Sequence, residues 1–173
     1  HNTGGLAGSA PEILIGHIAS ATSTLRVGSG GVMMPHYAPL KIAENFRMLA
    51  SLHPGRIDLG VGRAPGSDPV TMHALAPDHQ PISIEKYPAM VAELDGFLHD
   101  SLPADSPFRG RVQATPVPTD APELWLLASS PDSAAYAAHF GLPLGFADFI
   151  AQTDGAPIVD AYRANYRPSE RHP

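Results

Sequence analysis

Short apolar runs alternate along this chain with longer segments of helical periodicity. The apolar runs at 25–32, 57–62, 124–128 and 142–147 have the length of strands and are bounded by glycine, proline or polar turn residues. Apolar residues recur every three or four positions in the segments between and after them, at 39–52, 85–99, 132–140 and 154–166. This alternation predicts an α/β protein whose four strands are parallel, adjacent in chain order and joined by helical crossovers.

Local signals mark where the helices begin and end. Ser9 and Glu12 have the spacing of a capping box, which predicts that a first amphipathic helix begins beside Pro11. Gly141 follows the segment 132–140 and predicts a left-handed residue that closes that helix.

Composition narrows the class of protein. The 173 residues suffice for about one domain, and 43% apolar with 16% charged residues is typical of a folded chain. A net charge of −6 argues against a nucleic-acid partner. No apolar run approaches the roughly 20 residues of a membrane helix. The absence of cysteine excludes disulfides and thiolate metal sites, and it fits a cytoplasmic protein.

Candidate binding residues follow the first two strands. In parallel βα units ligands bind beyond the C-terminal ends of the strands. Gly30 and Gly31 lie near one such end, where glycine lets a ligand approach the backbone. Gly62 ends the next strand and leads to Arg63, whose guanidinium can bind a phosphate through two hydrogen bonds. The alternatives are a bulge at the two glycines and a surface ion pair between Arg63 and Asp68.

A serine cluster follows the third strand. Ser129 and Ser130 lie between that strand and the next helix, and Ser133 falls in the first turn of the helix. Free backbone N–H groups and the helix dipole make such a position suitable for an anion. The alternative is that one serine only caps the helix, and the two roles are compatible.

Other chemistries lack their motifs. The glycines near residue 30 do not form a dinucleotide fingerprint, because Met33 holds the place of the third glycine. No Gly-x-Ser-x-Gly elbow supports a serine hydrolase. The nine histidines lack the spacing of metal ligands, so we expect no metal site.

Several ordered blocks of the sequence resemble the bacterial luciferase-like family, whose members are flavin-dependent monooxygenases built on a TIM (β/α)8 barrel. The blocks are Arg26 to Pro35, Ala38 to Leu40, Ala43-Glu44, Pro54 to Gly66, Trp125 to Ser130 and Ala137 to Pro143. Together they cover most of the chain, and the segment 101–123 is its least distinctive part.

The resemblance implies that residues 1–173 form one partial barrel domain with about strands 3 to 6 of the TIM barrel. Family members carry one further βα unit before these strands and two after them. The chain opens at His1 without a methionine, which is typical of the interior of a longer sequence. His1 resembles the second histidine of the family's Glu-His-His block and is a catalytic candidate. The preceding histidine, usually assigned the catalytic role, would fall before His1.

The resemblance also implies a flavin site. The peptide between Gly30 and Gly31 matches a non-proline cis bond beneath the flavin ring. Arg63 and Ser130 match residues that bind the phosphate of FMN. The predicted cofactor-binding residues are Gly30, Gly31, Gly62, Arg63, Ser129, Ser130 and Ser133. FMN is the expected cofactor, with a deazaflavin as the alternative.

The leading functional hypothesis is an FMN-dependent oxidoreductase that uses O2 on a small organic substrate, with a flavin reductase as the source of reduced flavin. The alternatives are a non-catalytic, shortened flavin-binding barrel and an inactive fragment that needs a partner chain. Because the outer strands of an incomplete barrel have unpaired edges, we expect either a homodimer or further portions of a longer protein that cover them.

Overall fold

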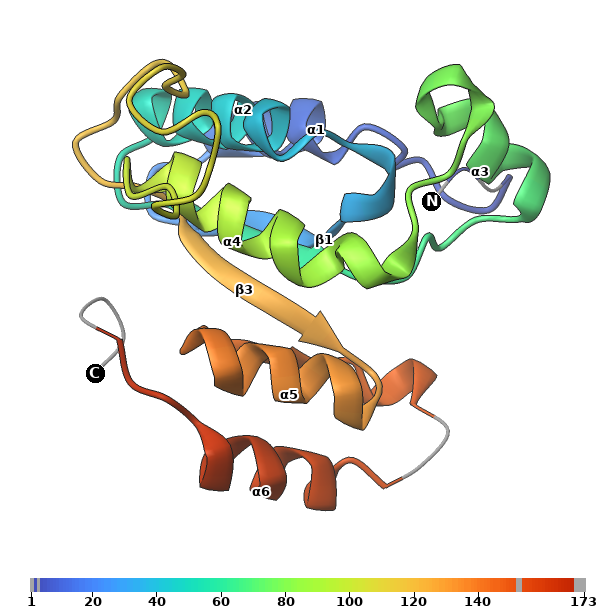
Figure 1. Ribbon diagram of the computed structural model, residues 1–173. Coiled ribbons are helices and arrows are strands. Elements are labelled where there is room, and N and C mark those ends of the chain that lie inside the picture. The colour runs from blue at the N-terminus through green and yellow to red at the C-terminus, as the bar shows by residue number, and fades with distance from the viewer. Residues whose placement is uncertain (1, 3, 152–153, 170–173) are drawn as a thin grey trace.

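A single four-stranded sheet organises the computed structural model, which describes residues 2, 4–151 and 154–169 (Figure 1). The strands are β1 (Val27–Met33), β2 (Ile57–Gly62), β3 (Glu123–Ala128) and β4 (Leu144–Phe146). They are parallel and lie in the order β1-β2-β3-β4. The predicted topology is therefore confirmed, with β1 beginning two residues later and β4 shorter than predicted.

The sheet is irregular at its first strand. Gly30 pairs with Gly60 and Val32 pairs with Val61, so Gly31 is an extra residue in β1. This confirms a bulge at the paired glycines. The peptide between Gly30 and Gly31 is cis, as the resemblance implies.

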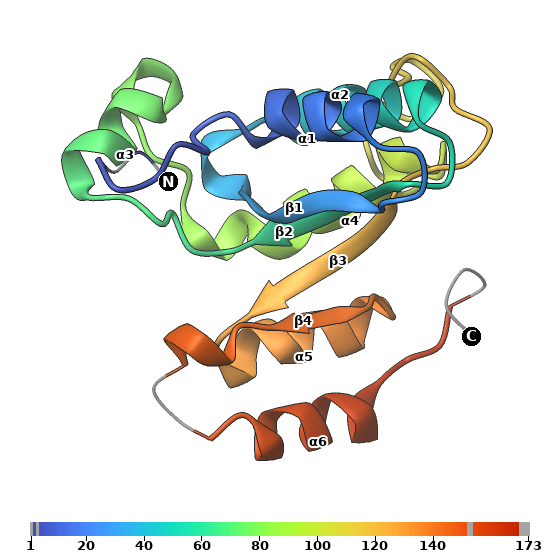
Figure 2. The same ribbon diagram turned by 180° about the vertical axis from the view of Figure 1, so that it is seen from behind.

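Six α-helices in the described part of the chain accompany the strands, and most follow the predicted segments. They are α1 (Pro11–Ala21), α2 (Pro39–Leu52), α3 (Pro69–Leu75), α4 (Tyr87–Leu98), α5 (Pro131–Phe140) and α6 (Ala156–Asn165). Figure 2 shows the strands in front of α4, and α6 lies beside α5, with Ile158 and Tyr162 in one apolar cluster with Leu144 and Phe146 at β4. Among the residues that the structure describes, no helix covers the other face of the sheet.

The core lies between the sheet and this helical layer. Every second residue of β3 and most residues of β2 are buried, among them Leu126 and Leu59. They join one apolar cluster with Phe46 of α2 and Leu94 of α4. The buried positions alternate along β3, so its remaining side chains, including Leu127, point to the face without helices.

A buried arginine ties the helical layer together. The Arg47 side chain is 2% exposed, and its guanidinium donates to the carbonyl oxygens of Phe97 and Ala114, each at 2.9 Å. It also donates to both carboxylate oxygens of Asp100, at 3.2 and 2.8 Å. These bonds fix α2 against the end of α4 and against the chain that leads into β3. They also hold the pKa of the Asp100 carboxyl below its usual value, mainly through the hydrogen bond from Arg47.

The predicted capping box at the first helix is wrong. The helix begins at Pro11, so Ala10 is the N-cap and no side chain caps the helix. Ser9 therefore lies one residue too early to take the capping position. The helix closure at Gly141 is confirmed, since this residue has φ 63° and its N–H bonds to the last helical carbonyls of α5.

Candidate cofactor site

A pocket of about 500 Å³ lies at the C-terminal ends of the strands. Its lining includes all seven residues that the sequence singled out: Gly30, Gly31, Gly62, Arg63, Ser129, Ser130 and Ser133. They come from β1, from the ends of β2 and β3, and from the start of α5. Parallel pairing brings these three strand ends to one edge, which is where this fold class binds ligands.

The floor of the pocket is backbone. A Cβ added at Gly30 would meet no atom within 4 Å, so this glycine presents bare backbone to open space. A Cβ at Gly31 would instead lie 2.5 Å from the carbonyl oxygen of Gly60 and 2.7 Å from the side chain of Leu127. The first glycine leaves room for a flat ligand, and the second lets the two strands and Leu127 pack closely.

Arg63 supplies the positive charge of the pocket. Among the lining residues that the structure describes, it is the one charged side chain. Its guanidinium is 23% exposed and lies 3.4 Å from the hydroxyl oxygen of Ser130 and 3.7 Å from a carboxylate oxygen of Asp132. Arg63 also lies close enough to Tyr87 to affect it electrostatically: burial raises the pKa of the Tyr87 hydroxyl, and the arginine partly offsets the increase.

The serines surround the start of α5. Ser130 is the N-cap residue of this helix, yet its side chain makes no capping hydrogen bond. Its hydroxyl instead donates to the hydroxyl of Ser133 at 3.3 Å and accepts from Arg63. The first backbone N–H groups of a helix have no partner within the helix. A cation, two hydroxyls and a helix N-terminus thus converge on one end of the pocket, an arrangement suited to an oxyanion.

Apolar side chains also line the pocket. Phe149 and Ile150 follow β4 on a 3₁₀ turn, Asp148–Ile150, and are 88% and 59% exposed. Leu6 comes from the N-terminal loop, and Met33 ends β1. The lining therefore combines a polar group, with Arg63 and the serines, and several apolar side chains.

These apolar residues were missed from the sequence. Phe149 and Ile150 could have been found by the rule that pointed to Arg63, because they follow the end of the fourth strand. Leu6 carries no comparable signal, since only the path of the N-terminal loop brings it to the pocket.

The alternative ion pair between Arg63 and Asp68 does not form. The Asp68 carboxylate caps α3 by accepting from the N–H groups of Val70 and Thr71, at 2.9 and 3.1 Å. Arg63 is paired across the strand ends with Asp132 instead. His1, the catalytic candidate, lies outside the described residues.

The residues that the structure describes lack two further features. No group of three or more histidine, aspartate or glutamate side chains there could hold a metal ion. No helix there combines the length and the apolar character that crossing a membrane requires.

Fold and pocket together define an α/β protein with a pocket at the C-terminal edge of a parallel sheet, as in part of a TIM barrel. The family model for luciferase-like monooxygenase matches residues 1–173, and the chain belongs to this family.

Known relatives agree with this assignment. A luciferase-like monooxygenase of Escherichia coli K12 is 47% identical over 173 residues, which cover 99% of this chain and 49% of the relative. The crystal structure of apo-MsnO8 superposes with a TM-score of 0.81 at 42% identity, over 95% of this chain and 47% of that one. The chain thus spans about half the length of the relatives it matches, and its sheet corresponds to part of their TIM barrel.

Two more distant structures share the fold. One is the oxygenating constituent of 3,6-diketocamphane monooxygenase from Pseudomonas putida in complex with FMN, with a TM-score of 0.55 at 19% identity, over 79% of this chain and 42% of that one. The other is an F420-dependent secondary alcohol dehydrogenase in complex with an F420-acetone adduct, with a TM-score of 0.63 at 18% identity, over 93% of this chain and 51% of that one.

Proposed function

We propose that this chain carries the phosphate-binding half of a flavin site in an FMN-dependent monooxygenase that acts on a small organic substrate. One observation carries the proposal. Arg63, Ser130, Ser133 and the N-terminus of α5 meet at one end of a pocket whose floor is the bare backbone of Gly30. A molecule that suits this pocket has one anionic group and a flat ring system, and FMN has both.

The residues present fit such a cofactor. The pocket volume of about 500 Å³ lies within the usual range of roughly 300–1,000 Å³ for ligand sites. Arg63 offers a charged, forked donor to the phosphate, and the hydroxyl of Ser130 and the helix N-terminus offer neutral donors. The open space at Gly30 admits a ring against the backbone.

Each part of the pocket then has a distinct task. When bound, FMN supplies the redox chemistry with O2. Arg63, Ser130 and Ser133 anchor its phosphate and so fix the position of the ring. Phe149 and Ile150 offer apolar contact surface to the rest of the ligand. The source of electrons is a flavin reductase.

Deazaflavin is the second cofactor candidate, because the same anion site suits the phosphodiester of F420. The family membership favours FMN, since a monooxygenase needs a flavin that reacts with O2. A direct comparison of the two ligands separates these candidates.

The test is equilibrium binding. FMN, riboflavin and F420 are titrated separately against the purified protein, with flavin fluorescence as the readout. We expect FMN to bind at least about tenfold more tightly than riboflavin, because one charged hydrogen bond is worth roughly 1.5–3 kcal/mol. Equal affinities for FMN and riboflavin would contradict a phosphate site, and tighter binding of F420 would favour the deazaflavin.

A further inference from the structure

The charge balance of the pocket depends on a residue outside its lining. Asp132 is the second residue of α5, and its carboxylate lies 3.7 Å from the guanidinium of Arg63. No other charged side chain among the described residues lines the pocket with Arg63. In the protein without ligand, the one positive charge of the pocket is therefore already paired.

Asp132 also interacts with the second group of the pocket that attracts an anion, the N-terminus of α5. A carboxylate in the first turn of a helix is stabilised by the positive end of the helix dipole. The same helix N-terminus, with Ser130 as its N-cap, faces the pocket. A phosphate that enters the pocket thus finds the Asp132 carboxylate already beside both Arg63 and the helix N-terminus.

We propose that Asp132 is a specificity-determining residue that competes with the ligand phosphate for Arg63. It lowers the affinity of the pocket for phosphate-bearing ligands and leaves that for ligands without phosphate unchanged. This inference rests on the proposed function only in naming FMN as the ligand, because the competition applies to any oxyanion in the pocket. The opposite role, in which Asp132 helps by holding Arg63 in place, predicts an effect of opposite sign.

The expected size follows from exposure. The Asp132 side chain is 77% exposed, so water and salt screen its interaction with Arg63. Exposed pairs of this kind typically change an equilibrium by a factor of about two to five. The effect should decline with added salt, because screening weakens it further.

Asp132→Asn is the decisive variant, because it keeps the shape of the side chain and removes its charge. Asp120→Asn is the matched control: it makes the same charge change just before β3, at the opposite end of this strand from Ser130. FMN and riboflavin are titrated against both variants and the wild type, at about 20 mM and about 500 mM salt. A second probe, inorganic phosphate, is assayed by the rise it causes in the midpoint of thermal unfolding.

We expect Asp132→Asn to bind FMN about two- to fivefold more tightly than the wild type at low salt, with a smaller gain at high salt and no change for riboflavin. Inorganic phosphate should stabilise this variant more than the wild type, and Asp120→Asn should behave as the wild type. Unchanged or weaker binding of FMN and phosphate by Asp132→Asn would overturn the inference while leaving the proposed function in place. A gain with inorganic phosphate alone, without FMN binding by either protein, would support the inference and reject FMN as the ligand.

Discussion

Replacing Arg63 with alanine removes the charge on which the phosphate site depends. The side chain lines the pocket, contacts Ser130 and Asp132, and is 23% exposed. Its loss should weaken the binding of FMN and leave riboflavin unaffected, because riboflavin lacks the phosphate. The comparison of the two ligands separates recognition of the phosphate from recognition of the ring.

The magnitude can be worked from the contacts. A hydrogen bond to a charged group contributes roughly 1.5–3 kcal/mol, which corresponds to a factor of about 10 to 150 in affinity. Asp132 already neutralises part of the charge of Arg63, so the value should lie towards the lower end. Arg63→Lys should lose less than Arg63→Ala, because lysine keeps the charge and lacks the planar fork.

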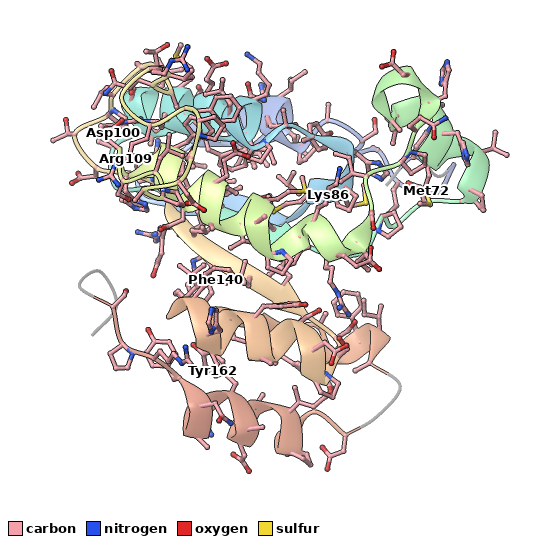
Figure 3. All side chains as sticks on the ribbon, in the orientation of Figure 1. Met72, Lys86, Asp100, Arg109, Phe140 and Tyr162 are labelled. Carbon is pink, nitrogen blue, oxygen red and sulfur yellow. The ribbon has the colours of Figure 1, made fainter. Side chains whose placement is uncertain are left out.

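The assay is a fluorescence titration of FMN and riboflavin against the wild type and each variant. Arg109→Ala is the matched control, because it removes the same charge at a position distant from Arg63. Figure 3 shows Arg109 beside Asp100, and Lys86 lies at the opposite end of α4. Unchanged circular dichroism and unfolding midpoint would show that the variants remain folded. Equal losses for FMN and riboflavin would refute the reasoning, because Arg63 would then support the ring or the fold and not the phosphate.

Four further predictions concern the scaffold. Arg47→Met should lower the free energy of unfolding by about 3–5 kcal/mol in urea titrations, because it leaves buried carbonyl groups and a carboxylate without their cation; a loss below about 1 kcal/mol would contradict a structural role. The pKa of the Asp100 carboxyl is lowered in the folded protein from its usual 3.8. Its contribution to stability is therefore present above pH 3.8 and is lost as the pH falls through the folded pKa. Asp100→Asn should flatten that part of the plot of unfolding free energy against pH. Gly31→Ala should lower the free energy of unfolding by about 1–3 kcal/mol, because its Cβ would lie 2.5 Å from the carbonyl oxygen of Gly60. Gly30→Ala should change the free energy of unfolding by no more than about 0.5 kcal/mol. Thermal unfolding that ranks the two variants the other way would refute the packing argument. The outer strands β1 and β4 each have one unpaired edge in the described sheet, so sedimentation should detect a dimer, and a stable monomer would count against this expectation.

The sequence by itself determined the order and direction of the strands. Short apolar runs between turn residues are local signals that indicate strands. Helices between these strands favour parallel pairing, because a helix can carry the chain back to the same end of the sheet. The same logic located the edge with the pocket, because Arg63 and Ser130 come within two residues of the ends of predicted strands. The resemblance to a known family added the cis peptide at Gly30–Gly31, which no local pattern would have indicated.

Tertiary structure decided which side chains meet. From the sequence Arg63 had a nearby acidic partner in Asp68, but the backbone N–H groups at the start of α3 take that carboxylate. The actual partner, Asp132, is distant in sequence and is brought close because β2 and β3 end side by side. The apolar lining at Phe149 likewise depends on β4 ending beside β3. Local sequence specifies the elements, since their energies arise within a few residues, whereas contacts between strand ends depend on the register of the whole sheet.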